Sequence, residues 1–132
     1  MPPTPWVILA AVRPEQDYLV MLSYLPLARF RKLPAFFRHV QAIRAQLQAS
    51  QGVVGYSLLA RLLRLQFWTL SAWTDRAALE RFVQANPHLA IMSDLRGHMG
   101  ATRFIEWQAK GAQLPPTWAE AMRRFQTETI DG

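Results

Sequence analysis

The sequence predicts one α+β domain of 132 residues, with the ferredoxin-like split βαβ order and an antiparallel sheet. Two observations support this class. Strand patterns alternate with helix patterns in the order strand, helix, strand, strand, helix, strand. A chain of this length also buries enough surface for one core without disulfides or metals. We therefore expect a single domain over residues 1–132, with an N-terminal arm at 1–15 and a C-terminal extension with a short helix at 112–132.

The first strand is predicted at Asp17–Leu25, and it has largely apolar side chains on both faces. Pro34 suits the first turn of a helix that runs to about Ser50. Its apolar positions recur at helical spacing, which is typical of an amphipathic helix packed on a sheet. The predicted buried stripe is Phe36, Phe37, Val40, Ile43 and Leu47.

Residues 53–60 form the second predicted strand, and Arg61–Arg64 connects it to a third at Gln66–Trp73. The third strand is the centre of the prediction because it is apolar on both faces. Phe67 and Trp73 point to one side, whereas Trp68, Leu70 and Ala72 point to the other. Both faces of this strand must therefore be covered.

Helix signals follow this strand directly. Asp75 is predicted to cap a helix over 75–85, and Asn86-Pro87 ends it and begins another over 87–96. Gly97 suits the left-handed residue after that helix. A fourth main strand is expected at Ala101–Gln108, and a short helix at Trp118–Phe125 before a polar tail.

This order places helices on one sheet face and leaves the other face bare. An apolar face of that kind is expected to be an interface or a ligand site. Packing the same face of a second copy against it would give a symmetric homodimer.

The N-terminal segment Trp6–Val12 is apolar but too short to cross a bilayer, and no basic residue precedes it. It is predicted to be an extra strand or a packed arm rather than a signal peptide. The absence of cysteine excludes disulfides and thiolate chemistry, and it fits a reducing, cytoplasmic location.

The net charge is +6, and it is unevenly distributed. Residues 1–64 contain eight basic residues but only two acidic ones, Glu15 and Asp17. Nucleic acid, an anionic membrane surface or an acidic ligand would each suit this asymmetry. A solvated basic helix face is the plainer interpretation and the preferred one. No nucleic-acid-binding motif accompanies the charge, so no nucleic-acid partner is expected.

The segment LSAWTDRAALERFVQANPHLAIMSDL, followed by a strand that contains Trp107, resembles the dimeric α/β-barrel superfamily. Trp73 at the strand end, Ala78-Leu79 and Phe82 on the next helix, and His88 and Met92 beyond the break carry the resemblance. Antibiotic-biosynthesis monooxygenases and haem-degrading monooxygenases belong to this superfamily. The tail LPPTWAEAMRRF is also similar to proteins related to spheroidene monooxygenase.

The resemblance implies a homodimeric oxidoreductase with an apolar pocket. Members without metal or flavin hold a polycyclic phenol while its carbanion reacts with dioxygen. The haem-degrading branch instead has a tryptophan and a histidine nine and nineteen residues after the strand-end tryptophan, where this chain has Phe82 and Met92. That haem mechanism is therefore not expected and no cofactor is required, although haem binding through another histidine is an alternative.

The candidate catalytic residues are His88, Tyr24 and Arg96, and no metal site is expected because His and Glu do not cluster at ligand spacing. For each histidine, a capping or surface role is the competing interpretation. Glu106 is expected to face solvent and pair with Arg103, or else to face inward as a base. The candidate ligand pocket consists of Tyr18, Phe67, Trp68, Trp73, Met92, His98 and Trp107.

Three functions remain open from the sequence. The first is a monooxygenase-like enzyme acting on an apolar aromatic or polyene substrate in a barrel pocket. The second is a non-catalytic protein that binds haem or an apolar metabolite. The third is a peripheral membrane protein that uses the basic Arg29–Arg44 region and inserts the Trp6–Val12 arm.

Overall fold

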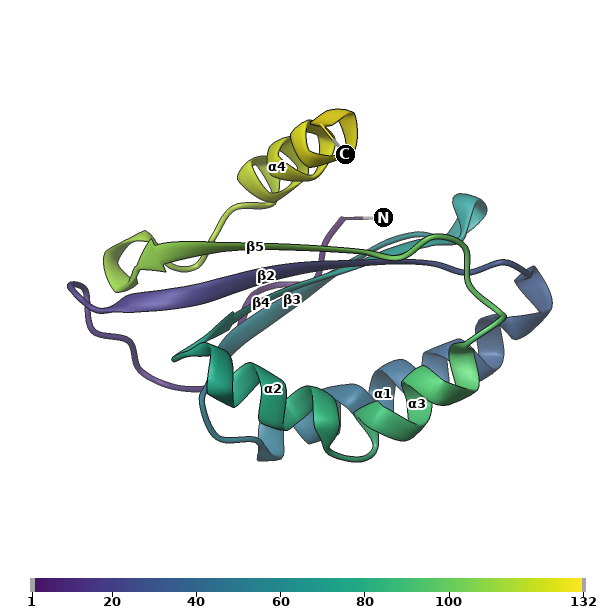
Figure 1. Ribbon diagram of the computed structural model, residues 1–132, viewed down its shortest axis with the longest axis horizontal. Helices are drawn as coiled ribbons and strands as arrows, with labels where there is room; N and C mark the ends of the chain where they lie inside the picture. Colours follow the sequence, from purple (N-terminus) through teal and green to yellow (C-terminus); the bar gives the residue numbers. More distant parts are fainter. Residues whose placement is uncertain (1, 132) are drawn as a thin grey trace.

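The computed structural model describes residues 2–131, with side chains described as far as residue 127. Five strands form one antiparallel sheet in the order β1-β3-β4-β2-β5 (Figure 1). This order confirms the predicted split βαβ arrangement, with a short extra strand at one edge. The strands are β1 (Val7–Ile8), β2 (Asp17–Pro26), β3 (Val53–Arg61), β4 (Gln66–Trp73) and β5 (Arg103–Lys110).

Three helices cover one face of the sheet, and α4 lies over the opposite face (Figure 1). Short 3-10 turns occur after β3 and β5 and before the first helix. The helices are α1 (Leu33–Ala49), α2 (Arg76–Gln84), α3 (His88–Leu95) and α4 (Trp118–Asp131), and the turns are η1 (Phe30–Lys32), η2 (Leu62–Arg64) and η3 (Gly111–Gln113).

Strand β4 has the predicted bounds and pairs along its length with β3 on one side and β2 on the other. Its alternation divides two cores as predicted. Trp68, Leu70 and Ala72 belong to the core on the α4 side. Trp73 packs on the other side with residues of α2, and Phe67 packs there against α1. The predicted need for cover on both faces is confirmed.

Local signals near α2 and α3 are also confirmed. Asp75 caps α2 by accepting a hydrogen bond of 2.8 Å from the backbone N–H of Ala78. Gly97 follows α3 with a φ of 86°, in the left-handed region that favours glycine. Phe37 differs from the prediction, because 42 % of it is exposed. The sheet meets only part of the apolar stripe of α1, and Phe37 lies at its margin.

The main correction concerns the sheet face that was expected to be bare. Helix α4 is longer than the predicted Trp118–Phe125 and lies over this face. Its Ala121 is fully buried in the core on that side, where Met122 and Phe125 also pack. The polar composition of the last residues favoured a frayed tail, but their apolar neighbours at helical spacing give the helix a buried stripe.

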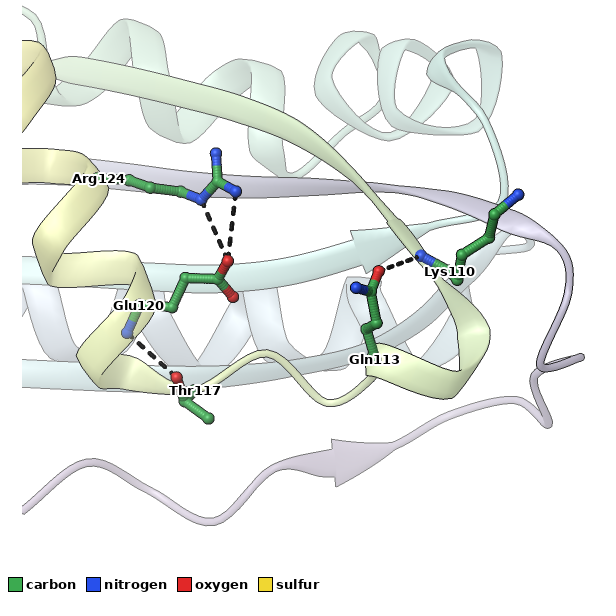
Figure 2. Close-up of polar contacts among 5 residues, drawn as sticks. All are labelled: Lys110, Gln113, Thr117, Glu120 and Arg124. Atoms are coloured by element: carbon green, nitrogen blue, oxygen red, sulfur yellow. Dashed lines mark hydrogen bonds and ion pairs between the residues drawn. The ribbon is translucent and has the colours of Figure 1, made fainter.

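The connection between β5 and α4 is fixed by local polar contacts (Figure 2). The Gln113 side chain accepts a hydrogen bond of 2.8 Å from the backbone N–H of Lys110. Thr117 caps α4 by accepting one of 3.1 Å from the backbone N–H of Glu120. Glu120 also pairs with Arg124 one turn later at 3.2 Å. These contacts stabilise the turn after β5 and the first turns of α4.

Ser57 joins α4 to the N-terminal arm. Trp118 Nε1 donates a hydrogen bond of 3.0 Å to Ser57 Oγ, which in turn donates one of 2.6 Å to the carbonyl of Thr4. The arm runs beside β3, and Trp6 packs directly over Gly55, where a Cβ atom would collide with the indole. The predicted extra strand is therefore present. No helix in the described part of the chain is long and apolar enough to cross a membrane.

Candidate functional site

An apolar cavity of ≈210 Å³ lies between α1 and the adjoining parts of β3 and β4. Its lining is mainly aliphatic and aromatic, with a few polar groups from the arm, α1 and β4. Such a cavity fits an apolar ligand oriented by a small number of polar contacts. The lining residues are Pro2, Thr4, Leu25, Phe36, Phe37, Val40, Gln41, Ile43, Arg44, Leu47, Leu58, Leu59, Ala60, Phe67, Trp68 and Thr69.

The packing of α1 explains why space remains there. Near the start of the helix, the Phe36 ring contacts the Phe67 ring with centroids 4.3 Å apart. Near its end, Leu47 is buried in the same core as Trp73. Between these two anchors the sheet presents the small side chains of Ala60 and Thr69. Small residues opposite a helix held at both ends leave a cavity between them.

Arg44 brings one positive charge to this apolar space. Its Nε donates a hydrogen bond of 3.2 Å to the hydroxyl of Tyr56, and its guanidinium lies 5.8 Å from the centre of the Tyr56 ring. Tyr56 is fully buried, with 0 % of it exposed. A guanidinium held by a rigid buried partner can bind an anionic oxygen with little further loss of side-chain freedom.

A second cavity of ≈270 Å³ lies between the end of α3 and the beginning of β5. Met92 and Arg96 line it, so the structure places these two predicted residues together. Leu25 of β2 lines both cavities and forms part of the wall between them. Both spaces lie on the side of the sheet that α1, α2 and α3 cover.

The other predicted residues fall into separate groups. Tyr18, Tyr24, Trp68 and Trp107 lie together on the α4 side of the sheet. There Tyr24 contacts Trp68 and Phe125, with ring centroids 5.1 and 5.0 Å away. These aromatic side chains form a packed core under α4, and Trp68 also contributes to the lining of the α1 cavity, as does the predicted pocket residue Phe67.

Two buried polar atoms on that side lack a hydrogen-bond partner among the described residues, namely Trp68 Nε1 and Gln66 Oε1. The other amide atom of Gln66 donates a hydrogen bond of 3.1 Å to the Tyr24 hydroxyl. One of these atoms is a donor and the other an acceptor.

The candidate catalytic residues do not converge. Tyr24 faces α4, whereas His88 and Arg96 lie at opposite ends of α3 on the other side of the sheet. Trp73 is 1 % exposed, and its ring contacts Phe82 at 5.2 Å, so side chains fill the space that was expected to be a pocket. His98 lies in an opening between α1 and α3, with His39 and Asp94. Within this chain, Tyr24, His88 and Arg96 therefore do not form one group.

His88 is held in a partly buried position at the start of α3. Its ring lies 5.1 Å from the Phe82 ring, and Nδ1 is 3.1 Å from the carbonyl of Val83. Burial lowers the pKa of His88 below its usual range, and the hydrogen bond to Val83 offsets part of this effect. This arrangement suits a neutral, structural imidazole.

The lowered pKa of His88 predicts a pH-dependent stability. Between the folded-state pKa and about 6.5, the unfolded chain binds more protons, so the free energy of unfolding falls as the pH decreases. Above about pH 6.5 this contribution is constant. We expect His88→Gln to weaken the pH dependence in urea titrations at about pH 5 and pH 7.5. His39→Gln is the matched control, and an unchanged profile for His88→Gln would contradict the prediction.

Glu106 lies on β5 and forms an ion pair with Arg76 of α2. This contact replaces the expected pairing with Arg103 and gives the carboxylate a structural role between β5 and α2. No carboxylate or histidine lines the α1 cavity among the described residues. The described residues also contain no cluster of three potential metal-ligating side chains.

Comparison with known proteins gave matches by structure alone. No family model and no curated protein sequence matches the chain. A protein of Nitrosomonas europaea assigned to the antibiotic biosynthesis monooxygenases aligns over 76 % of this chain and 93 % of its own, with a TM-score of 0.64 and 16 % identity. SnoaB of Streptomyces nogalater, a cofactor-independent oxygenase, aligns over 76 % and 99 % of the two chains, with a TM-score of 0.56 and 17 % identity.

A further structural match, from Pseudomonas aeruginosa, covers 71 % of this chain and 95 % of its own, with a TM-score of 0.63 and 21 % identity. The chain has a ferredoxin-like fold. Proteins with this fold include one assigned to the antibiotic biosynthesis monooxygenases and a cofactor-independent oxygenase, the kind of protein that the pattern around Trp73 resembles. Identities this low establish the ferredoxin-like fold and leave activity to be argued from the site.

The most useful site residues were missed as functional candidates. Val40, Ile43 and Arg44 lie on α1, and Leu58, Ala60 and Thr69 lie on the sheet opposite. The helical spacing of the α1 residues was visible, but it also fits an ordinary packed helix. The signal that distinguishes a cavity is the small size of Ala60 and Thr69 on the opposing strands, and recognising that these two residues face α1 requires the strand register.

Proposed function

We propose that the α1 cavity binds a compact aromatic compound with an acidic hydroxyl group and promotes its reaction with dioxygen. The observation that carries this proposal is an apolar cavity with Arg44 as the one cation among its described lining residues. The ferredoxin-like fold, which the cofactor-independent SnoaB shares, supports the choice of reaction. The apolar walls and Arg44 support the substrate class, which is also the one that the family resemblance implies.

The cavity size limits the ligand. Its ≈210 Å³ is below the range of about 300–1,000 Å³ that drug-sized ligands occupy. A compact set of fused rings therefore suits it better than a haem group. Of the three histidines, which all lie in the described part of the chain, none lines this cavity. The haem alternative would need a different surface.

The chemistry requires few protein groups, because the substrate itself is the reductant. A ring CH₂ group of the substrate loses a proton, and the resulting anion shares its charge with the ring oxygen. The net reaction with O₂ converts the CH₂ group to C=O and releases H₂O. One oxygen atom stays on carbon, and the other leaves with both hydrogens. Arg44 would stabilise the anionic oxygen, which lowers the pKa of the bound substrate and increases the reactive form. The apolar walls would exclude water and strengthen this interaction.

A suitable test is oxygen uptake with anthrone, read together with the formation of anthraquinone. We expect one O₂ consumed per anthraquinone formed, at a rate above that of the uncatalysed reaction. Val40→Trp should abolish this excess by filling the cavity, whereas Val83→Trp, on the exposed face of α2, should retain it. Arg44→Met should lower the rate by about 10- to 100-fold, because a hydrogen bond to a charged group contributes about 1.5–3 kcal/mol.

A non-catalytic binder of an apolar metabolite is the second candidate. The absence of a carboxylate or histidine among the described lining residues favours it, because no general base is in place. Calorimetric titration with 2-naphthol under nitrogen separates the two functions. Binding that Val40→Trp removes, without excess oxygen uptake, would establish the binder. Equal binding by the wild type and Val40→Trp would contradict the cavity for both functions.

A further inference from the structure

One end of the molecule combines positive charge with exposed apolar side chains. It consists of residues 29–32 with η1, residues 61–64 with η2, and the loop 96–98, and is called the basic end below. The three segments meet in space. Leu27 N–H donates a hydrogen bond of 2.8 Å to the Leu65 carbonyl, and Ala28 N–H donates one of 2.9 Å to the His98 carbonyl. In Figure 1 they lie together beyond the right-hand ends of the strands.

The basic end has a consistent charge. Its cations are Arg29, Arg31, Lys32, Arg61, Arg64 and Arg96, and all but Lys32 are exposed. No Asp or Glu occurs anywhere from residue 18 to residue 74. Asp94 lines an opening with Lys32 and His98, so one negative charge lies near this end. The net charge of the surface is nevertheless strongly positive.

The acidic residues that precede this stretch lie far away. Glu15 and Asp17 are at the start of β2, and the basic end follows the other end of that strand. Ten residues of extended chain span roughly 33 Å. That distance exceeds the Debye length of about 8 Å at physiological ionic strength. These carboxylates therefore do not neutralise the basic end.

Two large apolar side chains project from the same surface. Leu63 in η2 is 92 % exposed, and Phe30 in η1 is 59 % exposed. Phe30 lies between Arg29 and Arg31 in the sequence, and Leu63 lies in the segment bounded by Arg61 and Arg64. Exposed apolar tips surrounded by Lys and Arg match the interface of an anionic bilayer, where apolar burial adds to electrostatic attraction.

We propose that the basic end docks onto the surface of an anionic lipid membrane, with Leu63 and Phe30 entering the interface. The proposal does not depend on the proposed function of the α1 cavity. It also differs from the insertion of the Trp6–Val12 arm that the sequence suggested. That arm is held along β3, where Leu9 N–H donates to the Val54 carbonyl at 3.0 Å and Trp6 packs over Gly55.

Co-sedimentation with vesicles tests the proposal. We expect the full chain to sediment with phosphatidylcholine vesicles that contain phosphatidylglycerol, and to stay in the supernatant with phosphatidylcholine alone. Raising the salt from about 0.1 M to about 1 M should release it, since the Debye length falls from about 10 Å to about 3 Å. Equal binding to neutral vesicles, or no binding to anionic vesicles at low salt, would overturn the proposal.

Paired variants localise the contact. Arg31→Ala with Lys32→Ala should weaken partitioning roughly thirty-fold, at about 1 kcal/mol per charge. Arg81→Ala with Arg123→Ala removes the same charge from α2 and α4 and should have a much smaller effect. Leu63→Ser should weaken partitioning roughly ten-fold, whereas Ile8→Ser, also at an exposed residue, should not.

Two further outcomes would count against this docking surface. An equal loss of vesicle binding in the two double arginine/lysine variants would show that net charge alone attracts the protein to the membrane. The surface would be assigned to nucleic acid if the protein bound single-stranded RNA and no vesicles. That RNA binding would depend on Arg31 and Lys32 and would be unaffected by Leu63→Ser.

Discussion

Replacing Trp73 with alanine is expected to lower the free energy of unfolding by about 3–5 kcal/mol. Trp73 is 1 % exposed, and it packs against Phe82 of α2 in the core beneath the helices. Its Nε1 also donates a hydrogen bond of 2.9 Å to Ser71 Oγ, which would lose its partner. Domains of this size are stable by about 5–15 kcal/mol, so the loss is a large fraction of the total.

Urea denaturation followed by circular dichroism measures this effect. Trp6→Ala is the matched control because Trp6 is only half-buried, and its loss should cost markedly less. Trp73→Phe should fall between the wild type and Trp73→Ala, since it keeps a ring against Phe82. A loss below about 1 kcal/mol for Trp73→Ala would contradict the packing of α2 on β4.

The elements around Trp73 could be predicted because their signals are local. The alternation of side chains along β4 predicted which residues share a face. Asp75 indicated the start of α2, and Gly97 indicated the end of α3. β5 was predicted two residues too early, because the sequence after Gly100 marks no clear start and residues 101 and 102 have no partner strand. Pairing with β2, which the sequence cannot show directly, sets the true start at Arg103.

The candidate site was harder to predict because it depends on contacts between distant segments. Phe67 and Trp68 are adjacent in sequence, yet their side chains pack on opposite sides of the sheet. Aromatic character alone therefore grouped residues that the fold separates. Arg44 becomes informative only through Tyr56, a strand residue that holds its guanidinium. No sequence spacing identifies such a pair in advance.

Removing α4 should change the oligomeric state of the chain. A variant that ends at Pro116 would expose the sheet face that α4 covers, including Trp68 and Trp107, which are 2 % and 9 % exposed in the full chain. An apolar face of this kind associates with another surface when it has no cover. The same face of a second copy is its natural partner, and this is the homodimer that the family resemblance implies. We therefore expect the truncated chain to form dimers or larger species.

Gel filtration with light-scattering detection, on both chains at equal micromolar concentrations, tests this expectation. Trp118→Ala with Phe125→Ala is a milder variant, because it removes the hydrogen bond to Ser57 and the ring contacts with Tyr24 and Trp68 while it keeps the helix sequence. Its mass should rise less than that of the truncated chain. If the truncated chain stays folded and monomeric, this face does not drive self-association. If the full chain is already a dimer and the truncated chain is also a dimer, the two copies meet elsewhere, because α4 occupies this face in the full chain.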